Sequence, residues 1–178
     1  MTVKNFVANK INLLDRDEPY SKAACAKLRR AIGKSREETP DIWDITLPGA
    51  PDDERAGRAI HTSLTLYALH RQGKDESMCD NKTSFGTAIA GLVSKDADNE
   101  ASVRRRFNAV ATSSEFTELA HHARGLIQLL KSNSIKIDYP GFASDLFYFQ
   151  FPEYADSIRL KWGMQFYRVN NNEGTDEE

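Results

Sequence analysis

Uninterrupted apolar runs are short in this sequence. None approaches the roughly 18 residues of a membrane-spanning helix, and the N-terminal stretch MTVKNFVANKINLLDRDEP has no long apolar core of the signal-peptide type. Cysteine is nearly absent, since only Cys25 and Cys79 occur. Two cysteines are too few for a disulfide framework and indicate a reducing compartment. These absences predict a soluble, cytoplasmic protein.

Glycine and proline are also scarce, and they fall between segments with helical periodicity. In SFGTAIAGLVS, for example, Phe85, Ile89 and Leu92 recur at i, i+4 and i+7, which places them on one face of a helix. No segment alternates apolar and polar residues over the length of a strand with hairpin turns around it. The fold is therefore predicted to be all-α. The predicted helices cover about residues 6–14, 21–33, 53–72, 84–94, 100–111, 112–132, 138–150 and 153–169.

The polar stretch SKDADNE, residues 94–100, divides these helices into two groups. Each group is large enough for a small bundle, so we predict an N-terminal helical bundle over residues 1–97 and a C-terminal helical bundle over residues 98–169, packed together. Residues 170–178 carry four acids and no base, which predicts a disordered acidic tail. The predicted first core contains Leu28, Ile60, Leu64, Phe85 and Ile89. The predicted second core contains Phe107, Leu126, Leu130, Phe142, Leu146, Trp162 and Phe166.

Residues for catalysis or metal binding do not form a recognisable pattern. His121 and His122 are adjacent, so on a helix they point about 100° apart, and His61 and His70 exceed the i, i+4 spacing of helical metal ligands. No local signature pairs a cysteine with a histidine, and no phosphate-binding loop follows a strand. We therefore predict a protein that is not an enzyme, with no catalytic residue, metal, cofactor or small-molecule substrate.

The formal net charge of −2 conceals an uneven distribution of charge. Acids gather in the last nine residues and in the loop-like stretch TPDIWDITLPGAPDDE, so that several helical faces are left basic. A near-neutral total of this kind is compatible with a polyanionic partner.

Arginine and lysine recur outside the apolar stripes of several predicted helices. In ASVRRRFNAV, residues 101–110, one stripe holds the apolar side chains, and three consecutive arginines cover the remaining circumference. The planar guanidinium group can bind phosphate bidentately, so the excess of arginine weakens the interpretation as a merely solvated surface. The candidate nucleic-acid-binding residues are Arg29, Arg30, Lys34, Arg104, Arg105, Arg106, Arg124, Lys131, Lys161 and Arg168.

The chain resembles the CasB family, the small subunits of the type I-E CRISPR surveillance complex Cascade. The resemblance extends from about Ser21 to Arg168. It departs from the family in the stretch HHARG, where Arg124 is the one arginine in a block that is expected to be more basic. The blocks that carry it occur in the order CAKLRRAIG, a long apolar helix, SFGTAIAGL, VRRRFNAV, ELAHHARGLIQLLKS, IKIDYPGFASDLFYF and IRLKWGMQFYR.

The resemblance implies an all-helical, non-catalytic subunit that functions in antiviral defence. Its implied partners are the backbone and large subunits of Cascade, a second copy of itself, the guide RNA and the target DNA. The basic faces would hold phosphates of the guide–target duplex and of the displaced strand, and so stabilise the R-loop. Base pairing already supplies the specificity, so these contacts are expected to be independent of sequence.

Two other classes of function remain open from the sequence. One is a helical protein–protein adaptor whose basic faces contact acidic partners. The other is a helical DNA-binding regulator, which requires a helix-turn-helix with a recognition helix. No convincing pair of helices joined by such a short turn is found in the sequence.

Overall fold

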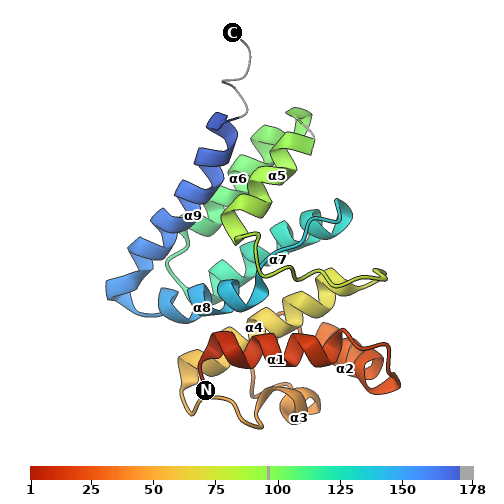
Figure 1. Cartoon of the computed structure of the whole chain (residues 1–178). Coiled ribbons are helices and arrows are strands. Elements are labelled where there is room, and N and C mark those ends of the chain that lie inside the picture. Colours follow the sequence, from red (N-terminus) through yellow and green to blue (C-terminus); the bar gives the residue numbers. More distant parts are fainter. Residues whose placement is uncertain (96, 173–178) are drawn as a thin grey trace.

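The protein is described by a computed structural model over residues 1–95 and 97–172 (Figure 1). This part of the chain is helical and contains no strand, with one isolated bridge between Cys79 and Ile137. The predicted all-α fold is confirmed. None of the described helices is both long and apolar enough to cross a membrane. The helices are α1 (Val3–Leu14), α2 (Pro19–Arg30), α3 (Trp43–Thr46), α4 (Glu54–Arg71), α5 (Phe85–Lys95), α6 (Glu100–Thr112), α7 (Phe116–Ser132), α8 (Tyr139–Phe149) and α9 (Pro152–Asn172), with 3₁₀ turns η1 (Pro40–Ile42) and η2 (Ala97–Asn99).

Local sequence signals set several of the helix ends. Asp53 caps α4 by accepting a hydrogen bond of 2.8 Å from the backbone N–H of Ala56, and Asp138 caps α8 in the same way. Gly33 and Gly73 follow α2 and α4 with φ angles of +78° and +73°, a conformation that glycine adopts without strain. The acidic stretch between α2 and α4 was expected to be a loop, but it contains η1 and α3.

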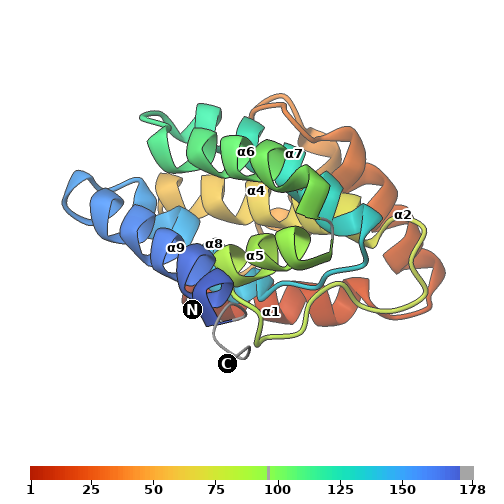
Figure 2. The same cartoon turned by 90° about the horizontal axis from the view of Figure 1, so that it is seen from above.

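The helices form three layers that share one hydrophobic core (Figures 1 and 2). The first four helices lie on one side, α5, α6 and α9 lie on the other, and α7 and α8 lie between them. Helix α8 packs against α1 and α4, while α5 packs along α9. Contacts therefore cross the boundary placed at residue 97, and the division into two bundles stays a prediction.

Every residue predicted for the two cores is buried. Phe85, however, was predicted for the first core, yet its ring packs on residues of the second. Its ring stacks on Phe142 with centroids 4.5 Å apart and meets the edge of Trp162 at 5.4 Å. Phe85 thus joins α5 to α8 and α9, because the apolar period of a helix fixes its buried face but not the helix that covers that face.

A buried carboxylate anchors the same region. Asp145 on α8 accepts hydrogen bonds from Trp162 Nε1 at 2.9 Å and from Lys161 Nζ at 2.6 Å, both on α9. A buried carboxylate is stable only when its oxygens are paired in this way. The Lys161 ammonium group is therefore part of the packing between α8 and α9.

Helices α5 and α9 approach each other closely at Gly86. A Cβ atom at this position would lie 2.5 Å from the carbonyl oxygen of Trp162, too close for any side chain. The short interhelical distance therefore requires glycine here.

The predicted acidic tail begins inside α9, which continues to Asn172. Residues 173–178 lie outside the part of the chain that the structure describes.

Replacing Trp162 with alanine is expected to lower the free energy of unfolding by roughly 3–5 kcal/mol, because it removes a large buried side chain and leaves Asp145 with one donor fewer. Leu160→Ala is the matched control, since Leu160 is 64% exposed on the same helix. It should change stability by no more than about 0.5 kcal/mol. Urea denaturation followed by circular dichroism measures both. Equal midpoints for the two variants would contradict the placement of Trp162.

Candidate nucleic-acid interface

Helix α6 presents its arginines to solvent as the sequence predicts. Val103, Phe107 and Val110 are buried, and the Phe107 ring stacks on Phe166 of α9 with centroids 4.4 Å apart. The three arginines, Arg104, Arg105 and Arg106, are all exposed. They are therefore free of core packing.

These arginines point in different directions. The guanidinium carbon of Arg104 lies 5.5 Å from the centre of the Tyr167 ring on α9, and the same side chain forms an ion pair with Glu100. Nη1 of Arg106 lies against α7, 3.3 Å from where a Cβ atom on Gly125 would be. Successive helical residues rotate by about 100°, so the three groups offer separate contacts and do not converge on one phosphate.

Basic side chains of α7 and of the neighbouring elements lie close together along α7. Its own Arg124 reaches the end of α2, where Nη1 lies 3.8 Å from the place of a Cβ atom on Gly33. Its Lys131 donates a hydrogen bond of 3.0 Å to Oε1 of Gln72, just after α4. We call this side of the molecule the α7 face. Its predicted site residues are Arg29, Lys34, Arg106, Arg124 and Lys131.

Positive charge is crowded at one end of the α7 face. Burial lowers the pKa of Lys131, and the nearby charges of Arg29 and Lys74 lower it further. Lys74 lies outside every predicted helix, so no periodic pattern drew attention to it.

The other predicted residues lie apart from this face. Arg168 is exposed on α9, next in sequence to the Tyr167 that Arg104 covers. Arg30 is exposed in the last turn of α2. Lys161 is bound to Asp145, which gives it a role in packing that the sequence did not indicate.

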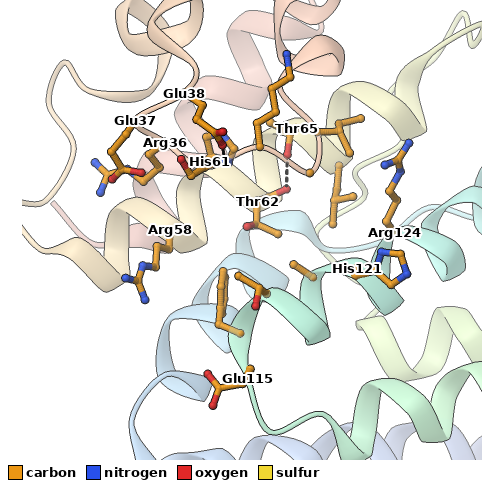
Figure 3. A pocket seen from close by; sticks show the side chains of 18 of the residues that line it. Arg36, Glu37, Glu38, Arg58, His61, Thr62, Thr65, Glu115, His121 and Arg124 are labelled. Atoms are coloured by element: carbon orange, nitrogen blue, oxygen red, sulfur yellow. Dashed lines mark hydrogen bonds between the residues drawn. The ribbon is translucent and has the colours of Figure 1, made fainter.

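A groove of about 590 Å³ separates the segment after α2 from α4 and α7 (Figure 3). Arg124 and His121 line the groove from α7, and Arg36, Glu37 and Glu38 line it from the segment after α2. The charges that line the groove are mixed, so its middle is less basic than the α7 face.

Arg36 packs against α4 at the wall of the groove, at a position where α4 has no side chain. Its guanidinium group occupies the space that a Cβ atom on Gly57 would fill. Glycine inside a helix is unfavourable by itself, which makes Gly57 the one signal in the sequence for this contact.

The two buried histidines of α4 form hydrogen bonds with neutral partners. Nε2 of His61 lies 3.3 Å from Oγ1 of Thr39, and Nδ1 of His70 lies 2.9 Å from the Tyr139 hydroxyl group. Burial lowers the pKa of each histidine to about 4. Within the described ranges, no group of three or more His, Cys, Asp and Glu side chains is placed to hold a metal ion.

The comparison with protein families decides what kind of molecule this is. The family model for the CRISPR-associated protein Cse2 matches residues 24–167, which is most of the chain. The chain belongs to the Cse2 family. The Cse2 match includes every candidate residue except Arg168.

Solved structures agree with membership of the Cse2 family. CasB from Thermobifida fusca is 28% identical, with a TM-score of 0.80 over 92% of this chain and 97% of that one. A chain of a CRISPR RNA-guided surveillance complex is 18% identical, with a TM-score of 0.81 and 99% of both chains covered. CasB from Thermus thermophilus is 21% identical, with a TM-score of 0.74 over 94% and 99% of the two chains. At these lower identities the last two show a shared fold. A comparison with curated proteins finds no significant match.

The buried histidines predict a loss of stability in mild acid. Their pKa of about 4 in the folded chain lies below the value of 6.5 in the unfolded chain, so the unfolded chain binds more protons as the pH falls from 6.5 towards 4. Each histidine should cost about 2–3 kcal/mol of stability by pH 4.5. We expect His61→Gln to be less sensitive to pH across this window than the parent, as measured by urea unfolding at several pH values.

His121→Gln serves as the control, because it removes an exposed histidine from the same groove. Its unfolding free energy should follow the pH dependence of the parent. Parallel profiles for His61→Gln and the parent would contradict the prediction.

Proposed function

We propose that this chain is a non-catalytic small subunit of Cascade, the type I-E CRISPR RNA-guided surveillance complex, and acts in antiviral defence. Membership of the Cse2 family supports this proposal. The likeness over almost all of both chains to a component of a surveillance complex also supports it. Its partners would be the backbone and large subunits and a second copy of itself.

The basic surfaces would hold nucleic-acid backbone. The observation that carries this proposal is the exposure of Arg104, Arg105 and Arg106 on a helix whose apolar stripe already secures it to the fold. Replacing a DNA duplex by a guide–target duplex is nearly balanced in free energy, so a few backbone contacts can tip it. Side chains that fan outward suit successive phosphates of the guide–target duplex or of the displaced strand, and so stabilise the R-loop.

The contacts of the predicted residues support different expected contributions to binding. Cations of the α7 face come from three helices and the segment after α2, and they lie on α7 or close to it. Arg104 forms an ion pair with Glu100, and Lys161 forms one with Asp145. We expect the largest contributions from Arg105, Arg106 and the α7 face, and little from Lys161.

A protein–protein adaptor is the second candidate. The observation that favours it is the ion pair between Arg104 and the carboxylate of Glu100, since acidic side chains of a partner would meet these arginines in the same way. The adaptor differs from the first proposal in one respect: its binding would be the same with and without nucleic acid.

Replacing Arg104, Arg105 and Arg106 together with alanine should weaken nucleic-acid binding for all sequences alike. Each lost phosphate contact should also reduce the slope of log K against log salt by about 0.7–0.9. Assembly into the complex and the melting temperature should stay near those of the parent, because no core packing is lost. Binding of random-sequence DNA and of target DNA across a salt series measures the effect.

A variant with alanine at Lys4, Arg58 and Lys82 removes the same charge from other exposed positions, and should bind nearly as the parent does. If the arginine variant assembles poorly while its assembled fraction binds DNA normally, the arginines are protein contacts and the adaptor is correct.

A further inference from the structure

Three cations meet where α2, the turn after α4 and the end of α7 come together. Arg29 is in the last turn of α2, Lys74 follows α4, and Lys131 is in the last turn of α7. The three segments lie on the same side of the molecule in both views (Figures 1 and 2). Arg29 and Lys74 line one cavity of about 200 Å³, and the charges of both act on Lys131.

Neutral groups hold the two lysines of this cluster in place. Nζ of Lys74 donates to Oγ of Ser134 at 2.7 Å, while Nζ of Lys131 donates to Oε1 of Gln72 at 3.0 Å. Arg71 donates a hydrogen bond to the backbone carbonyl of Lys74, which fixes the turn. The three cations are half-buried, so their positions are more restricted than those of freely solvated lysines.

The acidic side chains near this cluster already form ion pairs with other residues. Asp15 pairs with Arg71 at 3.3 Å, and Asp17 pairs with Lys22 at 2.7 Å. No described residue forms an ion pair with Arg29, Lys74 or Lys131. The Glu76 carboxylate also attracts Lys74, but it pairs with Lys136 at 2.7 Å. Three like charges held together without an ion-pair partner of their own repel each other, and an anion bound between them relieves that repulsion.

We infer that Arg29, Lys74 and Lys131 form a single binding site for one phosphate group of a nucleic-acid backbone. This inference rests on the proposed function, which places nucleic acid on the α7 face. It adds Lys74 to the interface and assigns the three cations to one phosphate, in contrast to the diverging arginines of α6. Arginine supplies a planar fork of donors and each lysine a mobile ammonium group, a combination that surrounds a phosphate with charge-assisted hydrogen bonds.

The direct test is Lys74→Gln in the full chain, with Lys82→Gln as the control. Both variants lose one positive charge, and Lys82 is an exposed residue of the same segment between α4 and α5. With a random-sequence RNA–DNA hybrid as the probe, Lys74→Gln should weaken binding and reduce the salt slope by about 0.7–0.9. Lys82→Gln should leave both unchanged. Equal binding by the two variants would overturn the inference.

A mutant cycle tests whether the three cations share one phosphate. Arg29→Gln, Lys74→Gln and Lys131→Gln are measured singly and in pairs. Contacts with a shared phosphate give losses that do not add, whereas independent sites add. Additive losses would show that the cations hold different phosphates, and would overturn the single site.

Inorganic phosphate separates a backbone site from a site for the free anion. The titration of the Lys131 ammonium group is followed by NMR, and its pKa should rise when the hybrid binds. A rise of the same size with inorganic phosphate at equal phosphate concentration would overturn the assignment to a backbone. The arginine variant of α6 keeps the two proposals apart: if it loses binding and Lys74→Gln does not, only the present inference fails. If neither variant loses binding, the proposed function fails as well.

Discussion

The arrangement of the second half of the molecule depends on the carboxylate of Asp145. It is buried, and it accepts hydrogen bonds from Trp162 and Lys161, which hold α9 against α8. Phe85 then brings α5 against the same tryptophan. Because α6 packs on α5 and α9 as well as on α7, the two hydrogen bonds of Asp145 contribute to the direction in which the arginines of α6 face. The interface is thus positioned by a polar interaction at a distance from it.

The helices were largely predictable because apolar residues recur with the helical period within each long segment. The stripe of Val103, Phe107 and Val110 defines the buried face of α6 with no information from elsewhere, and Asp53 and Asp138 cap their helices through local hydrogen bonds. What the period cannot specify is the partner of each stripe. Phe85 was assigned to the wrong neighbours for that reason, and the short helix α3 has too few turns for a period to be visible.

The candidate site was predictable only in part. The exposure of a side chain follows from the apolar pattern of its own helix, whereas the meeting of cations from different helices depends on the tertiary structure. The exposed arginines of α6 follow from the stripe beside them. Lys161 looked equivalent to them, yet a carboxylate 16 residues earlier in the chain binds it. Lys74 did not stand out, since a lysine in a loop has no pattern around it. The role inferred for Lys74 depends on Arg29 and Lys131, which only the fold brings near it.

Gly86 gives the fold an unusual kind of vulnerability. Its hydrogen atom faces the carbonyl oxygen of Trp162 in a space that would not admit a methyl group. A methyl group here would push α5 and α9 apart, and α6, which packs on both of them, would lose part of its support without the change of a single charge. Surface cations can therefore be exchanged without disturbing the fold, whereas a single methyl group at one uncharged, buried position would disturb the packing that supports the basic surface.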